Sequence, residues 1–331
     1  MWFCETVPDT VPSTERFIET NGVRLHTTEA GDRGAPVVVL AHGFPELGYS
    51  WRHQIPALAA AGYHVLAPDQ RGYGQSTRPE NIADYNISEL SADLVGLLDD
   101  VGAQRAVFIG HDWGAPVVWG TAQLHPNRVT AVAGLSVPPL PRAQVPPTQA
   151  FRAIFKDAFF YMLYFQEPGV ADAELGSDPA RTIRRMMGGL RLGGDQATAL
   201  RMIAPGPEGF IERLPEPDGL PDWISADEVD HYVAEFTRTG FTGGLNWYRN
   251  LDRNWEIMAE AVSATITVPA LFIAGGDDPV LGFTSRDRVT EVVTGPYREV
   301  ILDGAGHWLQ QERPDEVNGL LLDFLAGLGL Q

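Results

Sequence analysis

The chain has 331 residues, of which 44% are hydrophobic, a length that suits one large core with an insertion or two domains. Its formal net charge of −19 at pH 7, from 43 acidic and 24 basic residues, argues against binding to nucleic acid or to an anionic membrane surface. The single cysteine, Cys4, excludes an internal disulfide framework and a thiolate metal site.

The start of the chain carries no pattern of a targeting segment. Residues 1–14 lack a positively charged stretch followed by an apolar one. No run of about 18 apolar residues, the length that a membrane span needs, occurs further along. We therefore expect a cytoplasmic protein that does not cross a membrane.

Short apolar runs alternate with amphipathic stretches over residues 1–138, the pattern of a mostly parallel sheet covered by helices. The turn signal Asn21-Gly22 predicts an opening hairpin over residues 16–29. Buried strands are expected over residues 37–41, 64–67, 106–109 and 129–135. Helices are expected over residues 51–61, 88–101 and 115–124.

The pattern changes after Val137, where several prolines preclude a central strand. Residues 139–263 show helical periodicity and many aromatic side chains, interrupted by a proline-rich loop over residues 205–221, and we expect a helical cap. Two more strands, over 269–274 and 298–302, and a helix over 314–328 follow. The expected fold is α/β, with core segments 1–138 and 264–331, a mostly parallel twisted sheet flanked by helices, and the inserted cap between them.

Asp112 occupies the centre of a G-x-D-x-G sequence between an expected strand and an expected helix. This spacing is typical of a nucleophile elbow, whose strained turn needs small residues two positions on either side. Gly110 and Gly114 meet that need. A carboxylate nucleophile forms an alkyl ester by attacking a saturated carbon, so we expect an electrophilic sp³ carbon in the substrate.

Candidates for the remaining catalytic groups follow the ends of other expected strands. Asp278 comes after the strand over 269–274, with Asp277 as a competing acid, and His307 comes after the strand over 298–302. The carboxyl ends of parallel strands meet at one crevice, and the order nucleophile, acid, histidine is that of the α/β-hydrolase fold. The backbone N–H groups of Phe44 and Trp113 are the expected oxyanion donors.

With these motifs the chain resembles the epoxide hydrolases of the α/β-hydrolase superfamily over most of its length. The resemblance rests on residues 42–46 (HGFPE), 50–54 (SWRHQ), 69–76 (DQRGYGQS), 110–114 (GHDWG) and 306–312 (GHWLQQE). In the cap, residues 161–169 and 246–250 resemble the segments in which that family places two tyrosines that face the substrate. These would be Tyr161 and Tyr248. Tyr164 lies on the same helix face as Tyr161, so its hydroxyl is an alternative donor.

The resemblance implies an ether-bond hydrolase that needs no metal or organic cofactor. Asp112 would attack an epoxide carbon while the two phenols donate to the oxygen, because a phenol with a pKa of about 10 donates while neutral. A water activated by His307 and Asp278 would then hydrolyse the ester to a vicinal diol. Phe44, Trp113 and Tyr164 would contact the substrate, which the aromatic and methionine-rich cap predicts to be a small apolar epoxide.

Two other functions remain as alternatives. A haloalkane or haloacid dehalogenase of the same fold would form the same ester with a different leaving group, and Trp113 would serve as a halide donor. A non-catalytic relative would use the cap pocket to bind a ligand, although every expected catalytic residue is present. The sequence leaves open whether the protein forms a homodimer and whether its role is detoxification, lipid metabolism or biosynthesis.

Overall fold

The computed structural model describes residues 11–189, 196–261, 263–284 and 286–330; Cys4 lies outside these ranges. The structure confirms the α/β class and places eight strands in one sheet, in the order β1-β2-β4-β3-β5-β6-β7-β8. The strands are β1 Ser13–Thr20, β2 Val23–Ala30, β3 Val37–Ala41, β4 His64–Pro68, β5 Ala106–His111, β6 Val129–Leu135, β7 Ala270–Gly275 and β8 Tyr297–Leu302.

The sheet is antiparallel only at its β1 edge. β1 pairs with β2 through a turn at Asn21 and Gly22, both of which have positive φ, as the expected hairpin requires. β2 is also antiparallel to β4, and all later pairs are parallel. The predicted strands are confirmed, with ends that differ by at most two residues; β3 and β6 match the prediction, whereas β5 continues to His111 instead of ending at Ile109.

Both faces of the sheet are buried, which explains why its central strands read as continuous apolar runs. Along β3, Val37 and Val39 face one hydrophobic cluster while Val38 and Leu40 face the other. The first cluster lies under α2 Ile87–Val101 and α3 Gly114–Leu124. The second lies under α1 Gln54–Ala60 and α15 Pro314–Ala326.

The helix expected over residues 51–61 begins later than predicted. The chain first forms a 3₁₀ turn, η1 Gly48–Trp51, and α1 then starts at Gln54. Pro56 explains the start, because proline has no N–H to donate and its ring is tolerated only in the first turn of a helix.

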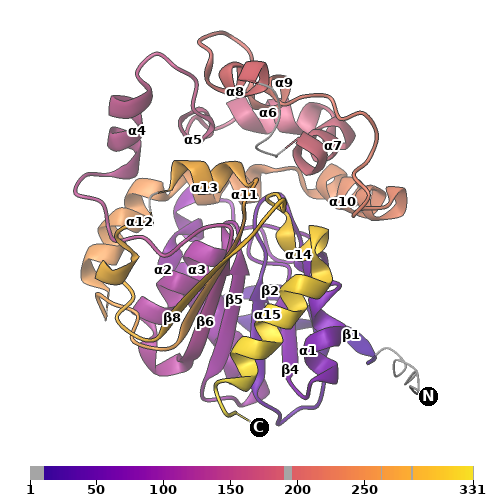
Figure 1. Cartoon of the computed structure of the whole chain (residues 1–331). Coiled ribbons are helices and arrows are strands. Elements are labelled where there is room, and N and C mark those ends of the chain that lie inside the picture. The colour runs from indigo at the N-terminus through magenta and orange to yellow at the C-terminus, as the bar shows by residue number, and fades with distance from the viewer. Residues whose placement is uncertain (1–10, 190–195, 262, 285, 331) are drawn as a thin grey trace.

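Nine α-helices lie between β6 and β7 in the described part of the chain. They are α4 Pro147–Phe155, α5 Tyr161–Tyr164, α6 Val170–Ser177, α7 Pro179–Gly189, α8 Gln196–Ile203, α9 Phe210–Arg213, α10 Ala226–Thr239, α11 Thr242–Arg249 and α12 Leu251–Ile257. We call residues 147–257 the helical insertion. Its helices α4 to α11 lie across one end of the sheet (Figure 1).

The remaining elements are short. They are η2 Ile82–Tyr85, η3 Pro126–Arg128, η4 Met258–Glu260, α13 Pro279–Phe283, η5 Val289–Glu291 and α14 Leu309–Glu312. No helix within the described ranges is both long and apolar enough to cross a membrane.

Candidate active site

Asp112 stands in a sharp turn between β5 and α3, with φ of 48°. Only glycine fits at the two flanking positions, Gly110 and Gly114, because a larger residue would clash with nearby backbone atoms. A Cβ on Gly110 would lie 2.1 Å from the carbonyl oxygen of Gly114, and a Cβ on Gly114 would lie 2.0 Å from that of Ala41. Both distances are far inside van der Waals contact, so the turn has the close packing of a nucleophile elbow.

The loop after β3 approaches this aspartate closely. The backbone N–H of Phe44 donates to Asp112 Oδ1 at 2.8 Å. A Cβ on Gly43 would lie 2.4 Å from the Cβ of Asp112, so only glycine allows the loop to come this near. Phe44 therefore stands where an oxyanion donor is expected. Trp113 is the next residue in the turn and the N-cap of α3, and the role of its N–H stays a prediction.

His307 lies between Asp112 and Asp278. Its Nε2 is 3.6 Å from Asp112 Oδ2, and its Nδ1 is 3.1 Å from each oxygen of the Asp278 carboxylate. His307 and Asp278 are 3% and 0% exposed, whereas the competing Asp277 is partly exposed. Asp278 also accepts a hydrogen bond from the backbone N–H of Val280 at 2.8 Å, so it caps α13 as well as holding the histidine.

The charges of Asp112, Asp278 and His307 shift the pKa values of one another. Burial alone would lower the pKa of His307, but the carboxylates of Asp278 and Asp112 outweigh it and hold this pKa well above its ordinary value. Burial alone would raise the pKa of Asp112, but His307, His111 and the Phe44 N–H keep it below its ordinary value. Asp112 is thus ionised at neutral pH, the state in which a carboxylate is a nucleophile.

Two phenols of the insertion lie beside this group. The ring of Tyr248, on α11, meets the Trp113 ring edge to face at a centroid distance of 5.0 Å and the Phe44 ring at 5.5 Å. Tyr161, at the start of α5, packs 6.0 Å from Tyr248. Burial raises the pKa of both hydroxyls, and the nearby Asp112 carboxylate raises it further, so both stay protonated.

Tyr164 has different neighbours. Its pKa is raised by burial and then by Glu174 and Glu212 of the insertion, not by Asp112. Its ring packs against Phe159 and Phe165. The structure thus brings together Asp112, His307, Asp278, Phe44, Trp113, Tyr161 and Tyr248, and leaves Tyr164 against the insertion's own carboxylates.

No role was predicted from the sequence for three polar side chains that lie beside the site: Glu46, His111 and Glu312. Each stands inside a motif of the family resemblance, which was the only signal in the sequence. The Glu312 carboxylate accepts from the backbone N–H groups of Gly306 and Trp308, at 2.8 and 3.0 Å, and so holds the loop on both sides of His307.

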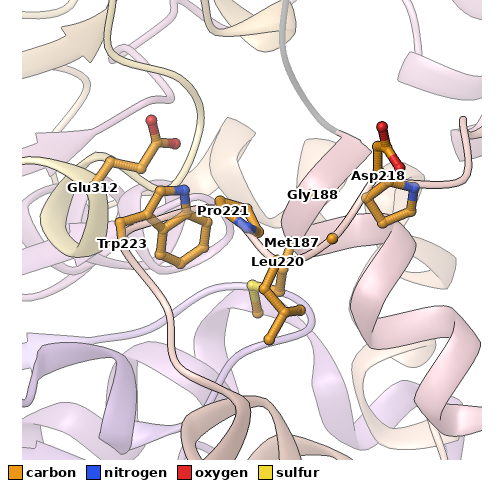
Figure 2. Close-up of a pocket in the computed structure, with 9 residues that line it drawn as sticks. Met187, Gly188, Asp218, Leu220, Pro221, Trp223 and Glu312 are labelled. Carbon is orange, nitrogen blue, oxygen red and sulfur yellow. The ribbon is translucent and has the colours of Figure 1, made fainter.

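Glu312 also lines a hollow of about 230 Å³ between α14 and the insertion. Figure 2 shows Glu312 and Trp223 at one end of the hollow and Asp218 at the other, with Met187 and Leu220 between them. The insertion loop over residues 217–223 therefore lies across the hollow from Glu312, the residue that holds the loop around His307.

Comparisons with known proteins agree with this geometry. The model of the alpha/beta hydrolase fold family matches residues 36–314. Epoxide hydrolase A of Mycobacterium tuberculosis is 72% identical over 318 residues, which cover 96% of this chain and 99% of that protein. Bifunctional epoxide hydrolase 2 of Rattus norvegicus is 41% identical over 305 residues, 92% of this chain and 54% of the rat protein.

Solved structures give the same result. The crystal structure of epoxide hydrolase A from Mycobacterium thermoresistibile superposes with a TM-score of 0.93 at 69% identity, covering 96% of this chain and 99% of that one. An epoxide hydrolase from an endophytic Streptomyces reaches 0.91 at 42% identity, covering 96% of each chain. The chain therefore belongs to the epoxide hydrolases of the α/β-hydrolase fold, enzymes that add water to an epoxide.

Proposed function

We propose that this epoxide hydrolase works through a covalent ester on Asp112. The observation that carries the proposal is the position of His307, whose two ring nitrogens face Asp112 and Asp278 from a buried site. Phe44 holds Asp112 Oδ1 in the oxyanion position, which leaves Oδ2 as the attacking atom.

Ring opening is the first half of the reaction. Oδ2 forms a bond to one epoxide carbon as the bond from that carbon to the ring oxygen breaks. The oxygen develops alkoxide charge, and Tyr161 and Tyr248 donate to it from the insertion. Their protonated state and their placement within one aromatic cluster with Trp113 support this role.

Ester hydrolysis is the second half. His307 Nε2 takes a proton from a water, and the resulting hydroxide adds to the carbonyl carbon of the Asp112 ester. The Phe44 and Trp113 N–H groups hold the oxyanion that forms on Oδ1. The bond from the carbonyl carbon to the alkyl oxygen then breaks, and that oxygen takes the proton from His307. The second water proton, left on the Asp112 carboxyl, replaces the one that the phenols gave to the ring oxygen, so a vicinal diol leaves and Asp112 is ionised again. Asp278 orients the ring and balances its transient charge.

The aromatic walls of the site support a small apolar epoxide as the substrate. The rings of Phe44, Trp113, Phe165 and Tyr248 pack edge to face against one another, and Phe44 of this cluster donates its N–H to Asp112. A cytoplasmic location and the division into core segments 1–138 and 264–331 around a cap over 139–263 stay predictions from the sequence. Assembly as a homodimer and a role in detoxification are left open by the sequence.

The test is the intact mass of a His307→Gln variant exposed separately to a panel of epoxides and a panel of haloalkanes. Without its base the ester cannot be hydrolysed efficiently, so the adduct accumulates. We expect a mass gain equal to one whole epoxide, absent from a variant in which Asp112 is also replaced by Ala. A gain of an alkyl group without its halogen, or an epoxide adduct that survives Asp112→Ala, would contradict the proposal.

A further inference from the structure

Gln166 joins the segment that carries one phenol to the segment that carries the other. It lies just beyond α5, the short helix that starts with Tyr161, and its side chain is partly buried. Its Nε2 donates to the backbone carbonyl oxygen of Met162 at 2.8 Å and to that of Tyr248 at 2.9 Å. A carbonyl oxygen only accepts, so the amide uses one N–H for each. One side chain thus connects the backbone of α5 with the backbone of the second tyrosine.

Arg249, the residue after Tyr248, makes the reciprocal connection. Its Nε donates to the backbone carbonyl oxygen of Phe165 at 3.1 Å. Its guanidinium also pairs with the carboxylate of Asp172 on α6. Burial alone would raise the pKa of Asp172, but Arg249 holds it below its ordinary value, so the pair is charged. Each tyrosine segment therefore holds the backbone of the other.

The two helices that carry the phenols differ in how they are supported. α11 packs directly on the core, where a Cβ on Gly243 would lie 2.1 Å from the backbone carbonyl oxygen of Gly72. α5 has four residues, and a helix of about one turn is not stable without contacts to its neighbours. The last carbonyl groups of a helix also lack partners within it, and Gln166 supplies one for Met162. The position of Tyr161 therefore depends on how α5 is attached to α11.

We propose that Gln166 and Arg249 are positioning residues that set the spacing between the hydroxyls of Tyr161 and Tyr248, so that both donate to the same epoxide oxygen. This inference rests on the ring opening proposed above. The two rings are 6.0 Å apart, and a hydrogen bond weakens once donor and acceptor separate beyond about 3.2 Å. One oxygen accepts from both phenols only within a narrow range of spacings. A shift of α5 by about 1 Å would leave the oxygen with one good donor.

A spacing role differs from a general stabilising role in one measurable respect. The spacing of two donors matters only while both donors are present. Removing the Tyr161 hydroxyl should therefore remove most of the effect of Gln166 on ring opening. A residue that merely stabilises the insertion would have the same effect with or without that hydroxyl, because effects on independent properties add.

The first test is a double-mutant cycle between Gln166→Met and Tyr161→Phe. Methionine keeps the length of the side chain and removes both N–H donors. We expect Gln166→Met to slow ester formation about 5-fold in the wild-type background and less than about twofold in the Tyr161→Phe background. Single-turnover intact-mass kinetics with one epoxide measure all four rates. Equal factors in the two backgrounds, or no effect in either, would overturn the proposal.

Two matched variants control the cycle. In the Tyr164→Phe background, which lacks a phenol outside the proposed pair, Gln166→Met should slow ester formation as much as it does in the wild type. Gln149→Met makes the same substitution at an exposed position of α4 and should leave ester formation unchanged. Hydrolysis of the ester uses groups of the core, so its rate should be the same in Gln166→Met as in the wild type.

Gln166→Glu decides the matter if Gln166→Met does not fold. An ionised carboxylate has nearly the same shape but only accepts, whereas a protonated one donates to one of the two carbonyl oxygens. Those oxygens also raise the pKa of the new carboxyl. Ester formation in this variant should be at least about twofold faster at pH 5 than at pH 8, and equal rates would overturn the proposal. Absence of any ester in His307→Gln, a variant that keeps Gln166, would instead contradict the proposed function.

Discussion

The hydroxyls of Tyr161 and Tyr164 differ in what surrounds them, although both tyrosines belong to α5. Asp112 and Asp278 act on Tyr161, whereas Glu174 and Glu212 act on Tyr164. We expect Tyr161→Phe to slow ester formation about 10-fold or more, because the epoxide oxygen loses one of its two donors. Tyr164→Phe is the matched control and should change the rate less than about twofold. Single-turnover intact-mass kinetics measure this step, and the reverse ranking would assign the donor to Tyr164.

The pKa shifts predict different pH profiles for the two half-reactions. Ester formation needs ionised Asp112, whose pKa is lowered, and protonated Tyr161 and Tyr248, whose pKa values are raised. Its rate should therefore stay constant from about pH 5 to 9. Ester hydrolysis needs neutral His307, so its rate should fall as the pH drops through the pKa of His307 in the ester. Rapid-quench kinetics separate the two rates, and a parallel fall of both at low pH would contradict this assignment.

The residues that carry the chemistry could be predicted because each stands beside a local signal. Asp112 lies between glycines two positions away on either side, and Asp278 and His307 lie in the loops that follow β7 and β8. The hydrogen bonds of Glu46 could not be predicted in this way, because its partners depend on folding. His111 is 65 residues away in the chain and Gln310 is 264 residues away. The sequence already favoured Asp278 over Asp277, and the structure adds the difference in burial, since it buries Asp278 and leaves Asp277 partly exposed.

The hairpin of β1 and β2 is tied to the parallel sheet by one carboxylate. Glu29 of β2 is 5% exposed and accepts hydrogen bonds from Arg16 of β1, from Arg33 and from His64 of β4, the last at 2.7 Å. Burial alone would raise the pKa of Glu29, but these three partners lower it to about 2. The ionised carboxylate therefore stabilises the junction between the antiparallel edge and the parallel sheet.

We expect Glu29→Gln to reduce the free energy of unfolding by about 2 kcal/mol at pH 7, the contribution typical of hydrogen bonds to a buried charge. The folded pKa of about 2 lies below the ordinary value of 4.5, so this contribution is complete above about pH 4.5 and is lost as the pH falls toward 2. Urea unfolding at several pH values should show the gap between wild type and variant closing on acidification. Exposed Glu19→Gln is the control, and a gap that stays constant with pH would refute the linkage.

The strands were more predictable than the helices of the insertion for a physical reason. A strand buried on both faces is apolar at nearly every position, and β3 to β7 show this in the sequence, with His64, His111 and Thr130 as the exceptions. The helices α5 and α9 have four residues each, too few to display a helical period, and packing against their neighbours defines them. Pro56 was a usable signal for the start of α1, which was nevertheless predicted three residues too early.

The whole molecule divides the proposed reaction between its two parts. Ring opening uses Tyr161 and Tyr248 of the insertion, whereas ester hydrolysis uses His307, Asp278 and Phe44 of the core. One ion pair that holds the parts together joins Glu228, on α10, to Arg52, between η1 and α1, at 2.5 Å. Arg52 also donates to Gln311 of α14 at 2.6 Å. A change that loosens the insertion should therefore affect the first half-reaction more than the second.

Reversing the charge of this contact tests the division. Glu228→Lys places a like charge beside Arg52, so α10 should move away and the phenols should be held less precisely over Asp112. We expect ester formation to slow several-fold, about 3- to 10-fold, while hydrolysis of the ester keeps its rate. Asp227→Lys makes the same charge change at the preceding, exposed position of α10 and should alter neither step. Single-turnover mass kinetics follow both rates in one experiment. A slower hydrolysis with unchanged ester formation would mean that the core depends on the insertion to hold its base, and the proposed division would be wrong.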